Sequence, residues 1–266
     1  MGIYACLKGI DIRVQYLLRM AGRTGVFQHF PDQYNRILSY HSVGGTGYGD
    51  ISPDVFRSHL EWIDRTYEIV DIPEVIHTDS SKRIALTFDD GYRSFYEVVY
   101  PIIREYSVPV TVFIIGLSIE DPEELDPERR YMTKPQLLEI ANEPLITIGS
   151  HTMTHTNLSG MECAEELSKE INGGTEYIES TIGINVDRFC YPHNAWSEEA
   201  RRVVRERHEY AVRGGGVREL ITDETDPYLL PRISGETTLP DLKYEVSDFP
   251  THVLTLKRSF EERLFS

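Results

Sequence analysis

The residues best suited to chemistry in this sequence are two adjacent carboxylates and two histidines that lie four positions apart. Asp89 and Asp90 follow the apolar run 84–88, and His151 and His155 follow a second apolar run that ends at residue 148. Two like charges at the edge of an apolar core are unfavourable unless a cation or strong hydrogen-bond donors compensate them. One carboxylate with two neutral imidazoles is a common ligand set for a divalent metal ion. The pattern therefore predicts a metal site and leaves one aspartate for acid–base work.

The two aspartates can be given different roles. The histidine pair lacks the glutamate that directly follows the first histidine in zinc proteases, so the general base must come from elsewhere. Asp89 is the natural candidate, and Asp90 can complete the ligand set with His151 and His155. A bound divalent ion lowers the pKa of its water and polarises a carbonyl, and an ionised carboxylate takes the proton. This combination hydrolyses an amide or an ester; the alternative is that both histidines are surface residues of a polar loop.

The elements that must position these residues alternate between strands and helices. Strand patterns cover residues 36–41, 84–88, 109–115, 145–150, 186–191, 209–213 and 230–233, and helical patterns follow Ser52 and cover 94–105, 133–141, 162–181 and 197–207. Repeated strand–helix pairs of this length predict an α/β fold with a parallel sheet that is closed, or nearly closed, into a barrel. Both clusters of chemical residues follow strands, where such folds place catalytic groups.

Three further segments have simple interpretations. The glycine-rich loop 44–49 lacks the lysine of a phosphate-binding loop and is expected to be a flexible turn. The acidic segment 118–130 is expected to be a solvated insertion or a lid. Gly173 and Gly174 are expected to weaken the helix 162–181.

Composition limits the partners and the compartment. The 266 residues carry 43 acidic and 27 basic side chains, which gives a net charge of −16. Such a surface repels nucleic acid and anionic lipid, so neither is an expected partner. An alternative explanation of the acidity is adaptation to a salt-rich cell interior. Three cysteines without close spacing predict free thiols in a reducing compartment. There is no secretory signal pattern and no run of about 18 apolar residues, so we predict a cytoplasmic protein without an integral membrane segment. An amphipathic helix at 10–21 is expected to dock on the protein, or alternatively to touch a membrane. The oligomeric state stays open.

Two motifs together resemble a known family. Thr87-Phe88-Asp89-Asp90-Gly91 and the segment from His151 to His155 are similar to the first two motifs of the polysaccharide deacetylases, which contain the NodB-homology domain of carbohydrate esterase family 4. The resemblance covers about residues 35–235 in the order expected for that domain. It implies a distorted (β/α)7 barrel and removal of an N- or O-acetyl group from a sugar. It also implies that Asp89 is the catalytic base and that Asp90, His151 and His155 bind the metal, expected to be Zn²⁺, with Co²⁺ or Ni²⁺ as alternatives.

No linker rich in Gly, Ser or Pro divides the sequence, so we expect one domain with an N-terminal extension. Residues 1–34 form a helical N-terminal extension, 35–240 form the deacetylase catalytic domain, and 241–266 form a polar C-terminal tail that packs on the same domain. These boundaries are expectations from the extent of the motifs and the polarity of the tail.

The later motifs of the family match less well. In the third, Cys190 stands where the family has an arginine and Asn194 where it has a glycine. Arg232, at the end of a late strand, can replace that arginine or can be an ordinary ion-pair residue. The Leu-x-x-His that carries the general acid is absent, and His41 and His193 are its substitutes. His41 alternatively has a structural hydrogen-bonding role.

Two functional hypotheses follow. The first is a metal-dependent hydrolase that deacetylates an N-acetylated sugar or a polysaccharide precursor, with a lipid-linked or nucleotide-linked amino sugar as the expected cytoplasmic substrate. The second, motivated by the altered third motif, is a carbohydrate-binding relative that keeps the metal but has weak turnover. Hydrolysis of a small non-sugar amide is a further alternative.

Overall fold

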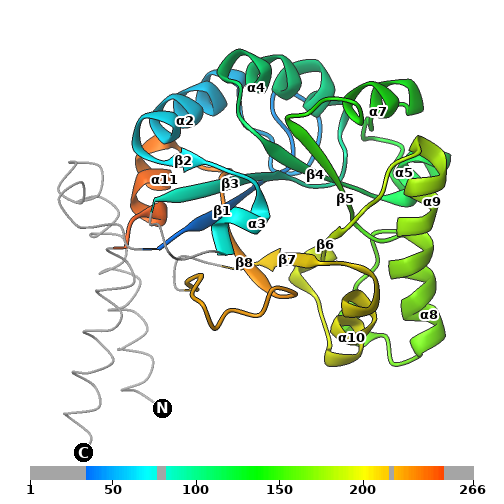
Figure 1. The fold of residues 1–266 in the computed structure, drawn as a ribbon. Helices are drawn as coiled ribbons and strands as arrows, with labels where there is room; N and C mark the ends of the chain where they lie inside the picture. Colours follow the sequence, from blue (N-terminus) through cyan, green and yellow to red (C-terminus); the bar gives the residue numbers. More distant parts are fainter. Residues whose placement is uncertain (1–33, 77–81, 216–218, 249–266) are drawn as a thin grey trace, which may run out of the picture. The chain divides into compact units, whose positions relative to one another are not determined.

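The structure is a computed structural model, in which residues 34–76, 82–215 and 219–248 are described (Figure 1). The chain divides into two compact units, of which one comprises Tyr34–Glu236 and the other comprises residues 1–33 and 237–266. In the second unit, the described residues contain helix α11 (Leu239–Val246), whose N-cap Thr238 accepts the N–H of Asp241. The expected helical N-terminal extension, the amphipathic segment 10–21 and residues 249–266 of the expected tail lie outside the described residues.

A barrel of parallel strands forms the centre of the unit Tyr34–Glu236. In its described part, seven strands close in the order β1, β8, β7, β6, β5, β4, β3, and β3 pairs again with β1. Their bounds are β1 Arg36–Tyr40, β3 Arg83–Phe88, β4 Val110–Ile114, β5 Ile146–Ser150, β6 Arg188–Cys190, β7 Tyr210–Gly214 and β8 Leu230–Ser234. A short strand, β2 (Glu68–Ile69), pairs with the beginning of β3. The predicted α/β barrel is therefore confirmed.

The barrel is uneven around its circumference. β4 and β5 pair at five positions, whereas β5 and β6 pair at one, Ser150 with Phe189. The strands on either side of this seam carry the histidine pair and the altered third motif. The weakly paired junction between β5 and β6 therefore lies beside the two loops that surround the site.

Helices lie on the outside of the barrel (Figure 1). Their bounds are α2 Pro53–Thr66, α3 Ile72–Ile76, α4 Tyr100–Tyr106, α5 Gly116–Glu120, α6 Pro122–Leu125, α7 Lys134–Ile140, α8 Ala164–Ser168, α9 Gly174–Ile182 and α10 Glu198–Arg207. Short 3₁₀ turns occupy Leu158–Gly160 and Pro192–Asn194, and π-helical segments occupy Phe95–Val99 and Lys169–Gly173. The helix expected over 162–181 is therefore divided into α8, a π-helical segment and α9. None of the described helices is long and apolar enough to cross a membrane.

The alternation of side chains along β3 places the catalytic candidates. Ala85 packs in the cluster that fills the barrel, together with residues of β1, β4, β6, β7 and β8. Phe88 points outward, where its ring stacks on Tyr40 and meets Phe56 of α2 edge to face. Because successive side chains in a strand alternate, Thr87 and Asp89 continue the inward face of Ala85. The strand therefore delivers Asp89 into the end of the barrel.

The glycine-rich loop is a firmly bonded turn, not the flexible one expected. The N–H of Gly44 donates to the carbonyl oxygen of Ile51 (2.8 Å), and the N–H of Gly45 donates to the carboxylate of Asp50 (2.8 Å). A Cβ at Gly47 would lie 2.5 Å from the ring of Tyr92. The glycines are needed because this loop packs directly against its neighbours.

The described cysteines agree with the expectation of free thiols. Cys163 is exposed and Cys190 is buried, and neither forms a disulfide within the described residues. Cys6 lies outside them.

Candidate active site

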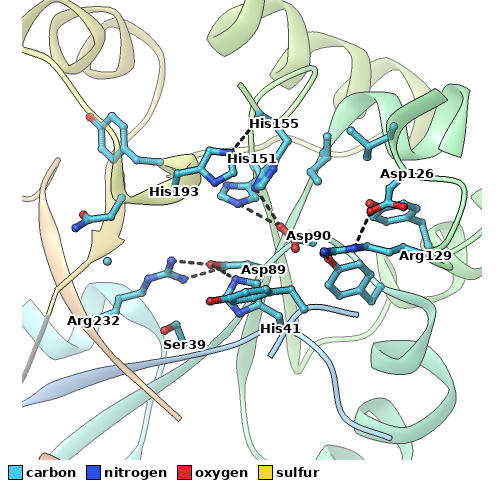
Figure 2. A pocket seen from close by; sticks show the side chains of 18 residues that line it. Ser39, His41, Asp89, Asp90, Asp126, Arg129, His151, His155, His193 and Arg232 are labelled. Carbon is cyan, nitrogen blue, oxygen red and sulfur yellow. Dashed lines mark hydrogen bonds and ion pairs between the residues drawn. The ribbon is translucent and has the colours of Figure 1, made fainter. Parts of the chain in front are cut away.

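A cavity of about 540 Å³ lies where the carboxyl ends of the strands meet (Figure 2). All the residues predicted from the sequence to act in the site line this cavity: His41, Asp89, Asp90, His151, His155, His193 and Arg232. They come from the ends of β1, β3, β5, β6 and β8, which a closed parallel barrel brings to one end. The topology therefore brings together residues that are far apart in the sequence; His41 and Arg232 are separated by 191 positions.

Asp90 and the two histidines form the first half of the site. Oδ1 of Asp90 lies 3.5 Å from Nε2 of His151 and 3.4 Å from Nε2 of His155. The same Oδ1 is buried and has no hydrogen-bond partner among the described residues. A buried carboxylate oxygen without a partner is unfavourable, so this atom calls for a cation or a strong donor.

Both imidazoles are neutral and suited to bind such a cation. Burial, reinforced by the charge of His155, lowers the pKa of His151 to about 4. Burial, reinforced by His193, lowers the pKa of His155 to about 4 as well. Nδ1 of His151 donates to the carbonyl oxygen of Cys190 (2.7 Å), which leaves the lone pair of Nε2 facing Asp90. The three side chains therefore fit a divalent metal ion.

Asp89 belongs to a separate, fully paired group. Arg232 donates from Nη1 to Oδ1 and from Nη2 to Oδ2 of Asp89, both at 2.7 Å. Burial by itself raises the pKa of Asp89, but the charge and hydrogen bonds of Arg232 outweigh burial and hold that pKa well below its ordinary value. Asp89 is therefore an ionised carboxylate, and its guanidinium comes from β8 rather than from the third motif.

Cys190 fills the place beside this ion pair. Its Sγ lies 3.1 Å from Nη2 of Arg232 and 3.7 Å from Oδ2 of Asp89. Burial raises the pKa of the Cys190 thiol well above its usual range, so the thiol stays protonated.

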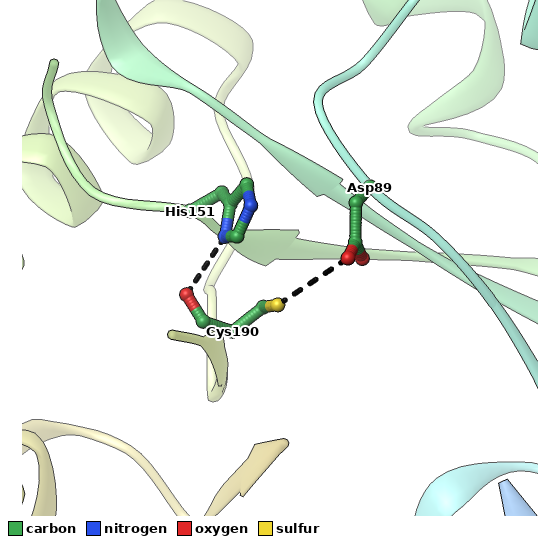
Figure 3. A group of neighbouring side chains, drawn as sticks. All are labelled: Asp89, His151 and Cys190. Atoms are coloured by element: carbon green, nitrogen blue, oxygen red, sulfur yellow. Dashed lines mark hydrogen bonds between the residues drawn. The ribbon is translucent and has the colours of Figure 1, made fainter. Parts of the chain in front are cut away.

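Asp89, His151 and Cys190 also lie close enough together to form a second possible ligand set (Figure 3). This second set does not suit a cation. The guanidinium of Arg232 already binds both oxygens of Asp89, and the neutral thiol of Cys190 is a poor ligand. The set of Asp90, His151 and His155 is the better metal site because, among the described residues, no cation is bonded to its carboxylate oxygen Oδ1.

His41 lies on the other side of Asp89. Its Nε2 is 3.8 Å from Oδ2 of Asp89, and its Nδ1 donates to the carboxylate of Glu236. Burial lowers the pKa of His41, but the hydrogen bond that His41 donates to Glu236 and the charges of Asp89 and Asp90 outweigh it, so the net pKa is raised. The imidazole is thus placed to carry a proton beside Asp89.

Glu236 was not predicted from the sequence. It follows β8 by two residues, at the same end of the barrel as Arg232. The sequence did offer a signal for Glu236. Its carboxylate comes just after the strand that supplies Arg232, which was already a candidate.

His193 lies against a metal-ligand candidate rather than beside Asp89. Its Nε2 donates to the carbonyl oxygen of His155 (3.2 Å), and the two ring centroids are 4.4 Å apart. The ring of His193 is exposed and contacts His155 rather than Asp89. We therefore expect His193 to support the loop of His155 rather than to transfer a proton near Asp89.

The acidic segment, expected to be a solvated insertion or a lid, is largely exposed, and three of its residues lie in the cavity wall. Leu125, Asp126 and Arg129 line the cavity, and Nε of Arg129 lies 2.8 Å from Oδ2 of Asp126. Arg129 also donates to the hydroxyl of Tyr92, whose ring stacks on Tyr131 at 5.3 Å. The pattern of like charges in the sequence gave no signal for this inward-facing pair.

Comparisons with known proteins agree with this geometry. The family model described as polysaccharide deacetylase matches residues 77–211. YxkH of Bacillus subtilis, named as a polysaccharide deacetylase, is 28% identical over 170 residues, which cover 61% of this chain and 58% of the relative. The poly-beta-1,6-N-acetyl-D-glucosamine N-deacetylase of Escherichia coli K12 is 26% identical over 201 residues, which cover 59% of this chain and 30% of that protein. The chain thus spans less than two thirds of the length of either relative.

Solved structures share the fold. A de-N-acetylase from Aggregatibacter actinomycetemcomitans aligns with a TM-score of 0.66 and 20% identity, covering 79% of this chain and 98% of that one. A polysaccharide deacetylase from Bacillus cereus aligns with a TM-score of 0.68 and 18% identity, covering 81% and 69%. The seven-stranded parallel barrel is therefore the fold of these proteins too.

Proposed function

This chain belongs to the polysaccharide deacetylase family, and from that premise we propose that it is a metal-dependent hydrolase that removes the acetyl group from an N-acetylated sugar. One observation carries the proposal. Two adjacent aspartates have opposite environments. Asp89 is bonded through both oxygens to Arg232, whereas Oδ1 of Asp90 has no hydrogen-bond partner in the described part of the chain and faces two neutral imidazoles. One carboxylate is thus prepared for proton transfer and the other for a cation.

The metal would be held by Asp90, His151 and His155. Two imidazole nitrogens and a carboxylate oxygen with open positions suit Zn²⁺, with Co²⁺ or Ni²⁺ as alternatives. When bound, such an ion supplies Lewis-acid polarisation of the acetyl carbonyl and acidifies a water molecule. Asp90 and the neutral histidines supply the lone pairs for it.

Asp89 acts as the general base. Arg232 keeps its carboxylate ionised and fixes its plane, since two parallel N–H···O bonds allow little rotation. The carboxylate accepts the proton of the attacking water at an oxygen lone pair that Arg232 does not use. The lowered pKa keeps Asp89 in the ionised, base form near neutral pH.

His41 acts as the general acid. Its Nδ1 is held by Glu236, so its Nε2 carries the proton that the departing sugar nitrogen needs. The raised pKa of His41 favours the protonated form near neutral pH. The water oxygen bonds to the acetyl carbon as Asp89 takes one of its protons, and the C–N bond breaks as the nitrogen takes a proton from His41. The products are a free amine and acetic acid, which ionises to acetate, and proton exchange with solvent restores Asp89 and His41.

A relative with weak turnover is the less favoured alternative. That hypothesis came from Cys190 and Asn194, which replace an arginine and a glycine of the third motif. Arg232 supplies the guanidinium that Cys190 lacks. Asn194 has φ +56°, in the left-handed region that asparagine tolerates better than most residues, so this turn can form without glycine.

The direct test is release of acetate from N-acetylglucosamine and its oligosaccharides by the Zn²⁺-loaded protein, before and after chelation. We expect one acetate per deacetylated residue, loss of activity with the chelator, and recovery when the metal is restored. Absence of acetate from every N-acetylated sugar, with metal bound, would contradict the proposal. Acetate release from a simple N-acetyl amide alone would favour a non-sugar substrate.

A further inference from the structure

The loop that carries the two histidines has an unusual backbone. Thr152 has φ +64° and His155 has φ +59°, and neither residue is glycine. Non-glycine residues in the left-handed region persist only where their surroundings impose the conformation. The geometry that points both imidazoles at Asp90 must therefore be held by contacts outside the loop.

One side of the loop is held by the beginning of α5. The N–H of Gly116 donates to the carbonyl oxygen of Thr152 (3.0 Å), and the N–H of Leu117 donates to that of Met153 (2.8 Å). Inside the loop, Oγ1 of Thr152 accepts the N–H of His155 (3.0 Å). These bonds use the carbonyl groups of the loop and leave the N–H groups of Met153 and Thr154 to be satisfied elsewhere.

On another side, the middle of the loop is bonded to Glu170. Its carbonyl oxygen accepts the N–H of Met153 (2.9 Å). Its carboxylate accepts the N–H of Thr154 at Oε2 (3.0 Å) and the hydroxyl of Thr154 at Oε1 (2.8 Å). Glu170 thus accepts three hydrogen bonds from the residues between the two histidines, although it does not itself line the cavity.

The local helix is built to allow this contact. Glu170 lies in the π-helical segment Lys169–Gly173, where the wider turn interrupts the regular α-helical ladder. At the following residue, Gly174, a Cβ would lie 2.6 Å from both the nitrogen of Met153 and the carbonyl carbon of Thr152. The two glycines that were expected only to weaken the helix include one whose missing side chain lets the histidine loop approach.

We propose that Glu170 is a positioning residue for the metal site, and that its hydrogen bonds to the loop set how tightly the metal is held. The carboxylate acts through Thr154 and Met153 on the direction of His151 and His155. The inference rests on the proposed function, because it requires that these histidines bind a metal ion.

The test compares two substitutions at one position. In Glu170→Ala the bonds to Thr154 are lost, and Zn²⁺ and Co²⁺ affinity measured by chelator competition should fall on the order of tenfold, as for other residues that orient metal ligands. In Glu170→Gln the amide can accept the N–H of Thr154 and donate to its hydroxyl, so affinity should stay within about threefold of wild type. The visible absorption of the Co²⁺ protein should change in the alanine variant only. Glu176→Ala and Glu176→Gln, at an exposed position on α9, are the matched controls.

Each outcome has a distinct meaning. Equal weakening in Glu170→Ala and Glu170→Gln would show that only the charge of Glu170 acts on the metal and would overturn the positioning role. Metal affinity in Glu170→Ala equal to that of Glu176→Ala, with the Co²⁺ spectrum unchanged, would also overturn it. Wild-type protein that binds no metal would instead defeat the proposed function. Thr154→Val, which removes only the hydroxyl, should weaken binding less than Glu170→Ala and should add little when combined with it.

Discussion

Two arginine–aspartate pairs, each with a buried arginine, lie at opposite ends of the same barrel. At the carboxyl end, Arg232 binds both oxygens of Asp89 at 2.7 Å and Oγ1 of Thr87 at 2.9 Å. At the amino end, Arg188, the first residue of β6, binds Oδ1 of Asp71 at 2.7 Å and Oδ2 at 2.6 Å. Arg188 also donates to Oγ1 of Thr111 in β4, at 3.2 Å. The two pairs are nearly identical in their bonds.

Their surroundings differ. Asp89 opens into the cavity and has His41 and Cys190 beside it. Asp71 lies just before α3, whose Glu74 accepts its N–H, and its carboxylate accepts the N–H of Ile72. We therefore propose that the pair facing the cavity serves proton transfer and that the pair facing a helix start serves only stability. Position in the fold, rather than the pair itself, decides the role.

The largest expected effect is loss of activity in Asp89→Asn. The amide cannot accept the proton of water, so kcat should fall by about 10²–10⁴-fold. Bound metal, measured by atomic absorption, should remain at the wild-type level because Asp90, His151 and His155 are intact. The amino-end counterpart, Asp71→Asn, should keep the kcat of wild type when assayed below its melting temperature. A comparable loss of kcat in both variants would erase the distinction between the two ends.

The second prediction concerns stability at the amino end. Asp71→Asn removes the carboxylate that binds both Nη atoms of Arg188 and leaves only Asp187, whose Oδ1 lies 3.6 Å from Nε. Asp71 is also 27% exposed, so water relieves part of the cost. The free energy of unfolding should fall by about 2–3 kcal/mol, below the range for a fully buried pair. Urea denaturation of the metal-free proteins measures this change. A loss below about 0.5 kcal/mol would place this pair among ordinary surface ion pairs.

The carboxyl end was far easier to predict from the sequence than the amino end. Asp89, Asp90, His151 and His155 follow strands, and parallel strands end together, so local pattern was enough. For Arg232 the sequence left two roles open, replacement of the third-motif arginine or an ordinary ion pair. Its partner depends on how the barrel closes between β8 and β1. Asp71 and Arg188 are 117 residues apart and follow no motif, so only the strand registers bring them together. Gly173 and Gly174 indicated an interruption of the helix near the π-helical segment. The sequence could not show that Gly174 is needed because the histidine loop packs against it.

The third prediction uses a histidine of the scaffold as the counterpart of those in the site. Burial lowers the pKa of His208 to about 4, as it does for His151, but His208 contacts Thr175 of α9 and Val204 of α10. Because the folded pKa lies below the ordinary value of about 6.5, the unfolded chain takes up the proton first as the pH falls. His208 therefore contributes no penalty above about pH 6.5 and destabilises the fold progressively toward pH 4.

At pH 5 this single group should reduce the free energy of unfolding by about 2 kcal/mol relative to pH 7. His208→Gln should remove that part of the pH dependence, even if it lowers stability at pH 7. Denaturation of both metal-free proteins between pH 5 and pH 7 measures the difference in slope. Parallel curves would mean that His208 is protonated at the same pH in the folded and unfolded states.

The smallest expected effect separates charge from geometry in the two pairs. Lysine keeps the positive charge but cannot donate two parallel bonds to a carboxylate. In Arg232→Lys, Asp89 should stay ionised but lose its fixed plane, so kcat should fall on the order of tenfold while KM and the acid limb of the pH profile change little. In Arg188→Lys, kcat should be unchanged and the free energy of unfolding should fall by about 1 kcal/mol.

These paired lysine variants test whether the matching bonds have different purposes. If the orientation of Asp89 matters for proton transfer, the carboxyl-end variant must lose rate at unchanged ionisation, because its ammonium still supplies the charge. If Arg232 serves only to keep Asp89 ionised, Arg232→Lys should retain the wild-type kcat, and the two ends of the barrel would then differ in exposure to substrate alone. A shift of the acid limb to higher pH in Arg232→Lys would instead assign the rate loss to a weaker charge interaction, since a less stabilised carboxylate becomes protonated at higher pH.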